Sequence, residues 1–379
     1  MKLSLSTKLF LKSWTLAEKV AAKQSPQPTL SSVHFKADES GLTLESTDLK
    51  LSVSKIAEGV TILEPGHALL PISPLGELLK KIDSDTVTIT VPEGDTQGTL
   101  QAGDNTYHLP LFDVNLFPDL PNNAQKTLFA RLSSSELTRL FDEGIVAANA
   151  TNDYPLYQSA TYLEIIDGVL HVVSTDGRRL SLSKTDVGAK ENKSVLLPFD
   201  AVKEYSRFLA GEPEEEVEIY CDETSLVWFD TPGTQYSVRR VDSNFPNYQR
   251  LLQSNVTTTL DVDRVAFINA LERVDLMVRR SQRNVILHLS PEGMLQILGQ
   301  GNESGQALEK LPASITGETL TVGYNIGYLL DGLKAAHRSD RVILKFSGSE
   351  GQTKILRPGT EDFHYMAMPV KIQQDAYSF

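Results

Sequence analysis

One structural pattern occurs three times in this amino-acid sequence, and no other feature restricts the possible folds as strongly. Each copy opens with a short strand and an amphipathic helix, as in KLSLSTKLFLKSWTLAEKVAAK, LFARLSSSELTRLFDEGIVAANA and TTLDVDRVAFINALERVDLMVRR. Alternating segments rich in β-branched residues follow. A second short helix comes next, in ISPLGELLKKI, LPFDAVKEYSRFL and YNIGYLLDGLKAA, and further strands close each copy. The chain is therefore expected to fold as three similar modules.

The repeat predicts the domain organisation. We place the boundaries near Gln125 and Ser254, because the closing strands of one copy end there and the next copy begins. The three predicted domains are 1–125, 126–254 and 255–379, the last with a short tail at 373–379. Each should contain two helices and about eight strands. Helices that cover one face of antiparallel sheet make the fold class α+β.

Composition and charge exclude several classes of protein. Lys and Arg number 36 against 49 Asp and Glu, a formal net charge of -13, which argues against a protein that coats DNA with a uniformly basic surface. No apolar run is long enough to cross a bilayer, and the first residues lack the features of a signal peptide. We therefore expect a cytoplasmic protein without a membrane partner. Cys221 is the only cysteine, which excludes an intramolecular disulfide.

Basic side chains gather on one face of a helix in each copy. In the first helix, Phe10, Trp14 and Ala17 share the core side, while four lysines lie within roughly a 60° arc on the opposite side. The second predicted helix of the second copy and that of the third copy each carry two basic residues at i, i+4 spacing. The eight basic residues are Lys8, Lys12, Lys19, Lys23, Lys203, Arg207, Lys334 and Arg338. Such faces could contact DNA phosphates without reading bases, although solvated helix faces also carry lysine and arginine.

The sequence contains no enzyme signature. It has no GxSxG, P-loop, GxGxxG or HExxH motif, and its seven histidines show no metal-binding spacing. Paired carboxylates could serve a glycosidase, but EPEEEVE is typical of a solvated turn that enters a strand. A β-rich scaffold of repeats would share the architecture, yet it would have no need of basic helix faces. STDGRRL is typical of a hairpin turn, because Asp-Gly is a strong turn signal. We expect no catalytic residue, cofactor or metal.

Several motifs resemble those of the β subunit of bacterial DNA polymerase III, the sliding clamp family. They are MKLSLSTKLFLK, STDLKLSV, STDGRRLSL, NFPNYQRLL, GYNIGYLLDGLKA and YMAMPVKI, and together they span essentially the whole chain. The resemblance implies a crescent-shaped chain of three domains that pairs head-to-tail with a second copy. The resulting ring, with helices inside and sheets outside, would encircle double-stranded DNA as a non-catalytic processivity factor.

The resemblance also implies partners and a site for them. A short linear peptide of the DNA polymerase III alpha subunit, the clamp loader or another clamp-motif protein would enter an apolar pocket between the second and third domains. Matching motifs assign this pocket to Thr175, Gly177, Arg178, Leu180, Pro246, Arg250, Leu251, Thr353, Met366, Met368, Pro369 and Val370. Methionine and leucine suit a surface that repacks around different partners.

A dimer interface follows from the same resemblance. The matching residues are Tyr107 and Leu109 in the first copy and Leu276 and Met277 in the third. On a helical wheel Leu276 points away from the core stripe of its helix. An exposed leucine is common, but here it falls where a second subunit is expected, and head-to-tail joints close into rings or grow into filaments. We therefore expect a homodimer.

The sequence departs from the family pattern at two places. Gln158 occupies a pocket position that is usually aliphatic. The chain also continues after Ile372 with QQDAYSF, where members of the family normally end. This tail, which contains Tyr377 and Phe379, either covers the pocket or is disordered, and its terminal position favours disorder.

Overall fold

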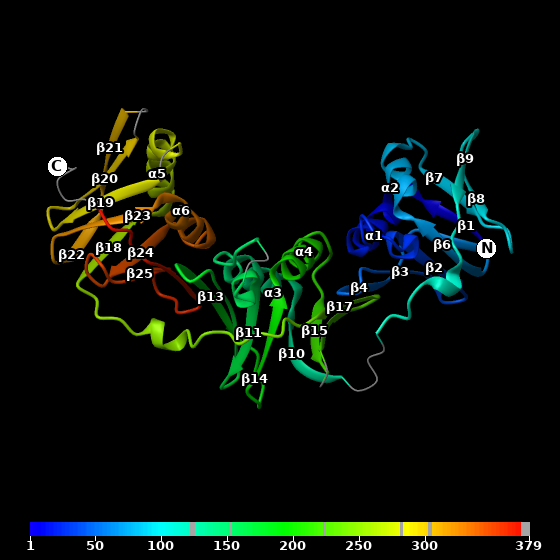
Figure 1. Cartoon of the computed structure of the whole chain (residues 1–379), viewed down its shortest axis with the longest axis horizontal. Helices are drawn as coiled ribbons and strands as arrows, with labels where there is room; N and C mark the ends of the chain where they lie inside the picture. The colour runs from blue at the N-terminus through cyan, green and yellow to red at the C-terminus, as the bar shows by residue number, and fades with distance from the viewer. Residues whose placement is uncertain (122–125, 152–153, 223–224, 281–282, 302–304, 373–379) are drawn as a thin grey trace. The chain divides into compact units, whose positions relative to one another are not determined.

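The computed structural model describes residues 1–121, 126–151, 154–222, 225–280, 283–301 and 305–372. The chain forms two compact units (Figure 1). Unit 1 comprises Met1–Ser134 and Gly211–Arg240, and unit 2 comprises Ser135–Ala210 and Val241–Phe379. The middle copy of the repeat is thus shared between the units. Among the described residues, no helix combines the length and the apolar character that a membrane crossing requires.

Unit 1 contains two antiparallel sheets and the helices α1 (Thr7–Val20) and α2 (Ile72–Lys81). The five-stranded sheet has the order β5 (Val60–Glu64), β1 (Lys2–Ser6), β7 (Thr86–Thr90), β8 (Gln97–Ala102), β9 (Asn105–Pro110). The eight-stranded sheet has the order β10 (Thr127–Ser133), β15 (Glu216–Cys221), β16 (Leu226–Thr231), β17 (Thr234–Arg239), β4 (Leu51–Ile56), β3 (Gly41–Thr47), β2 (Ser32–Asp38), β6 (Gly66–Pro71). Helix α1 packs on β3 and β4 and against α2.

Unit 2 repeats this plan with two more antiparallel sheets. Its helices are α3 (Ser134–Gly144), α4 (Phe199–Leu209), α5 (Arg264–Val278) and α6 (Ile326–Ala335). The nine-stranded sheet has the order β14 (Lys193–Pro198), β11 (Ala160–Ile166), β12 (Val169–Thr175), β13 (Arg179–Asp186), β26 (Phe363–Ala367), β25 (Thr353–Leu356), β24 (Arg341–Phe346), β18 (Thr258–Asp263), β22 (Ser314–Gly317). The four-stranded sheet has the order β21 (Gly305–Pro312), β20 (Met294–Gly301), β19 (Asn284–Ser290), β23 (Leu320–Asn325).

The order of these elements confirms the predicted threefold repeat. In each copy, as far as the structure describes it, a strand and a helix come first, and four or five strands follow, the first three of which pair in succession. A second helix then precedes three more paired strands. Two hairpin turns show the correspondence in atomic detail. The Thr47 hydroxyl donates to the carbonyl of Leu51 at 2.6 Å, and the Thr175 hydroxyl donates to the carbonyl of Arg179 at 2.6 Å. The predicted hairpin in STDGRRL is therefore confirmed.

Two of the sheets join consecutive copies of the repeat. Strand β17, the last of the middle copy, pairs antiparallel with β4 of the first copy. Strand β26, the last of the third copy, pairs antiparallel with β13 of the middle copy. The copies therefore share main-chain hydrogen bonds. The domain limits near Gln125 and Ser254 stay a prediction.

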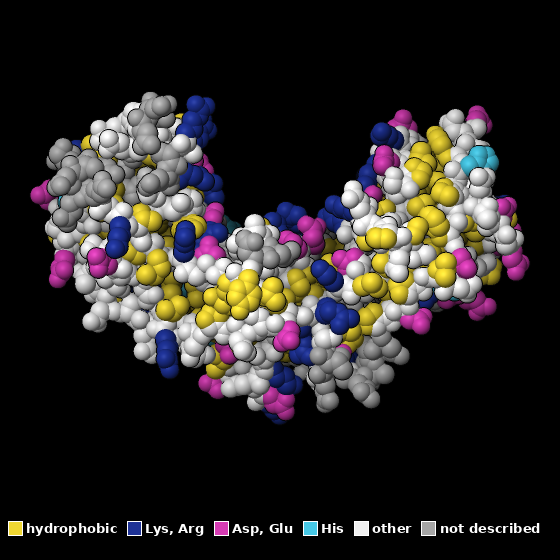
Figure 2. All heavy atoms as spheres, viewed as in Figure 1, with side chains coloured by type: hydrophobic (Ala, Val, Ile, Leu, Met, Phe, Trp, Pro, Cys, Tyr) yellow, Lys and Arg dark blue, Asp and Glu magenta, His cyan; other side chains and the backbone are white. Residues whose placement is uncertain are grey.

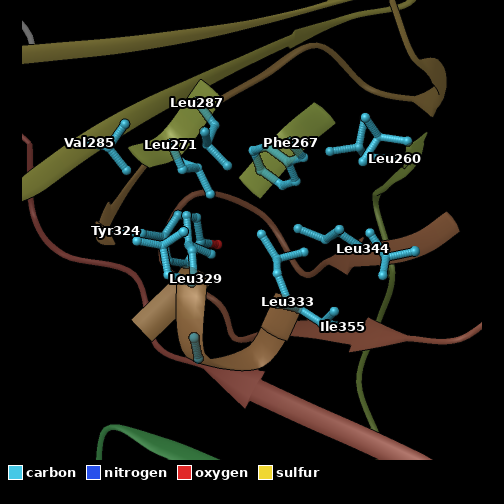
Figure 3. Packing of buried hydrophobic residues seen from close by; sticks show 14 of the residues in the cluster. Leu260, Phe267, Leu271, Val285, Leu287, Tyr324, Leu329, Leu333, Leu344 and Ile355 are labelled. Atoms are coloured by element: carbon cyan, nitrogen blue, oxygen red, sulfur yellow. The ribbon is translucent and has the colours of Figure 1, made fainter. Parts of the chain in front are cut away.

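One large hydrophobic cluster of unit 2 is built around both helices of the third copy. Figure 3 shows Phe267 and Leu271 of α5 on one side of the cluster and Leu329 and Leu333 of α6 on the other. Strand residues complete the cluster, among them Val285, Leu287, Tyr324, Leu344 and Ile355. All nine of these side chains are fully excluded from solvent. This packing, more than helix propensity, stabilises the two helices.

In unit 1 the predicted core side of the first helix is confirmed. Phe10, Trp14 and Ala17 are fully buried. The rings of Phe10 and Trp14 lie 6.1 and 6.0 Å from the ring of Phe35 on β2. Because these residues hold one side of α1 against the sheet, the opposite side of the helix faces solvent.

Candidate functional site

An apolar cavity of about 170 Å³ opens in unit 2. Its walls come from the turn between β12 and β13, from β26, and from the short 3-10 helix η4 (Gln249–Leu252). The lining residues are Thr175, Gly177, Arg178, Arg179, Leu180, Leu251, Gln352, Met366, Ala367 and Met368. These segments are about 70 residues or more apart in the chain, and the β13–β26 pairing brings the first and the last of them together. An apolar cavity of this size can hold one or two side chains of a peptide.

Seven of the twelve pocket residues predicted from the sequence line this cavity: Thr175, Gly177, Arg178, Leu180, Leu251, Met366 and Met368. The other five lie beside it. Pro246 lines a neighbouring cleft, and Arg250 is exposed on η4. Thr353 is buried behind the wall, where its hydroxyl bonds to Tyr324. Pro369 and Val370 are half-buried, and the N–H of Val370 donates to the carbonyl of Gly323 at 2.8 Å.

Three lining residues were not predicted: Arg179, Gln352 and Ala367. Each is the direct chain neighbour of a predicted residue. Motif spacing therefore located the segments, but it did not decide which neighbours face the cavity. That choice depends on how the strands pair.

The turn at the pocket is held by its own polar side chains. Gly177 adopts φ +84°, a conformation that favours glycine, and its N–H donates to the Thr175 hydroxyl at 3.1 Å. Arg179 Nε donates to the Asp176 carboxylate at 2.9 Å, and the guanidinium also contacts Asp331 on α6. Burial disfavours the charge of Arg179, but contacts with Tyr365, Asp176 and Asp331 outweigh it and raise the pKa. The guanidinium thus ties the pocket turn to α6.

Gln158, the predicted departure from an aliphatic pocket residue, lies next to this turn. Gln158 is half-buried. Its side chain lies close to Gly177, because a Cβ atom built onto that glycine would be 3.4 Å from the Gln158 side-chain nitrogen. It is not among the cavity's lining residues. The predicted tail 373–379, with Tyr377 and Phe379, lies outside the described residues.

The first group of basic residues lies in unit 1. Lys8, Lys12 and Lys19 are exposed on α1, as predicted. Lys23 is exposed as well, but its placement on the helix is wrong, because α1 ends at Val20 and the backbone is extended at Ala21. The helical wheel therefore applies to three of the four lysines.

The second group lies in unit 2. Lys203 is half-buried on α4 with its ammonium 5.1 Å from the ring centroid of Phe199, and Arg207 bonds to Glu204 at 2.6 Å. Lys334 on α6 is exposed and pairs with Glu272 of α5 at 2.7 Å. Arg338 is exposed but lies beyond α6, which ends at Ala335, so its predicted place on that helix is wrong. In Figure 2, Lys and Arg side chains gather along the side of unit 2 where Figure 1 places α5 and α6.

The residues predicted for the dimer interface lie on two elements. Tyr107 is half-buried on β9, an edge strand. Leu109 on the same strand is fully buried in its own chain, so it would stabilise the position of β9 and would not contact a second subunit directly. On α5, Leu276 is 55% exposed, and Met277 is partly buried against the core of unit 2.

A half-buried histidine bonded to Tyr248 predicts a pH dependence. His171 Nδ1 lies 2.7 Å from the hydroxyl of Tyr248, and burial, assisted by Lys184 and His364, lowers the pKa of His171 to about 4. The unfolded chain would bind a proton that the folded chain excludes. Stability is therefore complete above the ordinary pKa of 6.5 and should decrease as the pH falls from there to about 4. We expect a loss on the order of 2 kcal/mol.

The pH dependence can be measured by urea unfolding at a series of pH values. His171→Gln should reduce the acid-induced loss, while His337→Gln, at an exposed histidine, should leave it unchanged. Equal pH profiles for the wild type and His171→Gln would reject the assignment.

An apolar pocket and exposed lysines on α1 are features that suit a binding protein. Within the described residues, no group of three or more His, Cys, Asp or Glu side chains could hold a metal ion.

Comparison with known proteins identifies the kind of binding protein. The sequence matches three domain families of the DNA polymerase III beta subunit: the N-terminal domain at 1–121, the central domain at 131–247 and the C-terminal domain at 249–371. The beta sliding clamp of Synechococcus elongatus is 26% identical over 372 residues, which cover 95% of this chain and 96% of the relative. The beta sliding clamp of Pseudomonas putida is 26% identical over 374 residues, which cover 98% and 100%.

Solved structures agree with this assignment. The DNA polymerase III subunit beta of Pseudomonas aeruginosa is 26% identical with a TM-score of 0.88, covering 98% of this chain and 100% of that chain. The DNA polymerase sliding clamp of Bacillus subtilis, 23% identical with a TM-score of 0.90 and the same coverage, shows the shared fold. This chain belongs to the DNA polymerase III beta subunit family, the beta sliding clamps. It is a DNA replication processivity factor and not a catalytic enzyme.

Proposed function

We propose that two copies of this chain join head-to-tail into a closed ring around double-stranded DNA, and that the ring tethers the replicative polymerase. Family membership supports the general role, and the internal repeat supports the joint. Where copies of the repeat meet within the chain, the last strand of one copy pairs with a strand of another: β17 with β4, and β26 with β13. By the same rule β9, the last strand of the first copy, would pair with the third-copy strand that corresponds to β4 and β13. That strand is β21.

One observation carries this proposal. Strands β9 and β21 each stand at the edge of their sheet and lack a second pairing strand among the described residues. Such an edge readily pairs with another chain. Since the two edges belong to different copies of the repeat, their pairing between molecules is heterologous, and it yields a ring when the rotation closes.

Helix α5 supports the β21 edge. It packs on β20 and β21, and Arg273 forms a two-pronged bond to Glu309 on β21, at 2.9 and 2.7 Å. Leu276, on the same helix, is exposed. We propose that Leu276 and Met277 meet the region of Tyr107 on β9 of the second copy, which would bury apolar surface beside the strand pairing.

Double-stranded DNA would pass through the ring and meet basic residues of the helices. The exposed lysines of α1 can contact phosphates, which carry no sequence information. A net charge of -13 is compatible with this role because a ring is retained by its topology, so weak and salt-sensitive contacts suffice. Strong binding would slow sliding.

The apolar pocket of unit 2 would receive a short peptide of the DNA polymerase III alpha subunit, the clamp loader or other clamp-motif proteins. Its lining combines Leu180, Leu251, Met366 and Met368. Flexible methionine side chains can adapt to different peptides. We propose that the protein binds these partners in the cytoplasm.

Retention on DNA tests the ring. The chain, loaded by its clamp loader, should stay on nicked circular DNA and leave linear DNA through its ends, because only topology holds it. The triple change Lys12→Glu, Lys19→Glu and Lys23→Glu should lower loading and processive synthesis severalfold, since each glutamate repels phosphates. The fold and the dimer should persist, because all three side chains are exposed.

A matched control reverses three other exposed cations, at Lys50, Lys190 and Arg239, which lie at strand ends and in loops. It changes the net charge equally and should keep processivity. Equal retention on circular and linear DNA would exclude the ring. Equal processivity of the two triple variants would reject the DNA-facing role of the α1 lysines.

A further inference from the structure

The pocket wall formed by η4 lies within a connection that has little regular structure. Strand β17 ends at Arg239 and β18 begins at Thr258, and η4 is the only helix in the segment between them, all of which the structure describes. Nevertheless, η4 presents Leu251 to the cavity with 45% of that residue exposed. A short 3-10 helix is not stable by itself, so other groups must hold this wall in place.

Tyr248 anchors the beginning of η4. It is only 2% exposed, and its hydroxyl donates to the Glu164 carboxylate at 2.8 Å and lies 2.7 Å from His171 Nδ1. Its ring packs edge-on against Tyr162 and Phe245. The carbonyl of Tyr248 accepts the N–H of Leu251 at 2.9 Å. One residue thus links the wall of the pocket to β11 and β12.

Two side chains from the β25 region anchor the end of η4. Gln352 Nε2 donates to the carbonyl of Leu251, and the Lys354 ammonium donates to the carbonyl of Leu252. Lys354 is buried, and burial together with the nearby Lys345 lowers its pKa. Burying a lysine costs free energy unless it gains hydrogen bonds, and here it gains one from the connection.

The anchor continues into the floor of the pocket. Tyr248 packs in a small apolar cluster with Leu180 and Met366, and both of these residues also line the cavity. A movement of the Tyr248 ring would therefore displace Leu180 and Met366 on the floor of the pocket through direct packing. It would displace Leu251 through the backbone hydrogen bond. Packed side chains transmit such shifts because interiors contain few voids.

We propose that Tyr248, fixed by Glu164, is a positioning residue that sets the shape of the pocket for partner peptides through the packing and hydrogen bonds of η4. Lys354 and Gln352 hold the other end of the same wall. This inference rests on the proposed peptide-binding function of the pocket, and its test separates the two.

The test compares two tyrosines that make the same bond. Tyr248→Phe removes the hydroxyl bonded to Glu164, and the control Tyr220→Phe removes a hydroxyl that donates to Glu218 at 2.7 Å in unit 1. The probe is a fluorescein-labelled short peptide with neighbouring leucine and phenylalanine side chains, measured by anisotropy on the full-length chain. We expect Tyr248→Phe to weaken binding about five- to tenfold, because the wall loses a charge-assisted hydrogen bond. Tyr220→Phe should change the peptide affinity less than about twofold, because it removes a hydrogen bond of the same kind outside the pocket wall.

Methyl NMR of labelled methionine adds a readout that needs no peptide. The chain contains five methionines, and two of them, Met366 and Met368, line the pocket. Met368 is 45% exposed and lies outside the Tyr248 cluster, so it reports the shape of the wall. Its signal should shift in Tyr248→Phe and in Glu164→Gln, while Met294 on β20 should not shift.

The outcomes are distinct. An unshifted Met368 signal together with unchanged affinity overturns the inference, even where the melting temperature falls. A Met368 signal that shifts in Tyr248→Phe, while the wild-type protein binds no peptide, rejects the proposed function of the pocket and keeps the positioning role of Tyr248. If Tyr248→Phe fails to fold, Glu164→Gln decides alone. The double variant, Tyr248→Phe with Glu164→Gln, should weaken binding no more than Tyr248→Phe alone, because the loss of the hydroxyl already removes the bond that Glu164→Gln weakens.

Discussion

Glu143→Ala should destabilise unit 2 by about 3 kcal/mol, because it removes the buried carboxylate that Arg139 and Arg357 share and leaves them only the more exposed carboxylates of Glu136 and Asp362. Glu143 at the end of α3 is completely buried. Its carboxylate accepts bonds from Arg139 at 2.9 Å, from Arg357 at 2.7 Å and from the Ser183 hydroxyl at 2.6 Å. Both arginine side chains are at most 7% exposed. Arg357 follows β25, so this network also joins α3 of the middle copy to the third copy.

Urea unfolding can assign the loss to unit 2. Both tryptophans, Trp14 and Trp228, lie in unit 1, so their fluorescence reports that unit, while far-ultraviolet circular dichroism reports both. Glu143→Ala should move the dichroism transition to lower urea and the fluorescence transition less. Glu191→Ala serves as the control, because Glu191 pairs with Lys193 on the surface and should leave both transitions unchanged. An unmoved dichroism midpoint in Glu143→Ala would show that the network contributes nothing.

The second large effect concerns the ring. The double change Leu276→Ala with Met277→Lys should convert the dimer into monomers. It removes the exposed leucine and places a charge where the proposed joint buries apolar surface, and an unpaired buried charge is costly. Sedimentation or light scattering should then report half the mass of the wild-type particle, and retention on circular DNA should be lost. Peptide binding should persist, because the lining of the pocket comes from one chain and includes neither Leu276 nor Met277.

The matched control for this variant is Leu63→Ala with Ile56→Lys. Both residues are 52% exposed, and Leu63 lies on β5, at the opposite edge of the sheet from β9. This control should remain dimeric. A dimer in the Leu276 and Met277 variant would show that the proposed α5 contact is wrong, and a monomer in both would indicate nonspecific damage.

Local sequence patterns predicted local structure well. The wheel of the first helix placed Phe10, Trp14 and Ala17 in the core, and the Asp-Gly signal predicted the turn at Gly177. Periodicity failed at helix ends. Lys23 and Arg338 continue the spacing of basic residues past the points where α1 and α6 end. The spacing of side chains does not reveal where the backbone leaves the helix unless a cap marks the position.

The candidate site shows the same difference between what local sequence patterns predicted and what they missed. Motifs located every segment of the pocket, yet Arg179, Gln352 and Ala367 were missed, and Pro246 lies in the neighbouring cleft. The anchor at Tyr248 also had no sequence signal, because its partners Glu164 and His171 lie about 80 residues earlier in the chain.

The sequence by itself determined the threefold repeat, the α+β class, the amphipathic helices and the hairpin turns, because each of these depends on residues that are close together in the chain. Only the tertiary structure decided that β13 pairs with β26, that Leu109 is buried and that η4 forms a wall of the pocket. The physical reason is that strand pairing and burial depend on contacts between distant segments. The periodicity of a strand indicates which of its faces is buried, but it does not indicate which distant strand pairs with it.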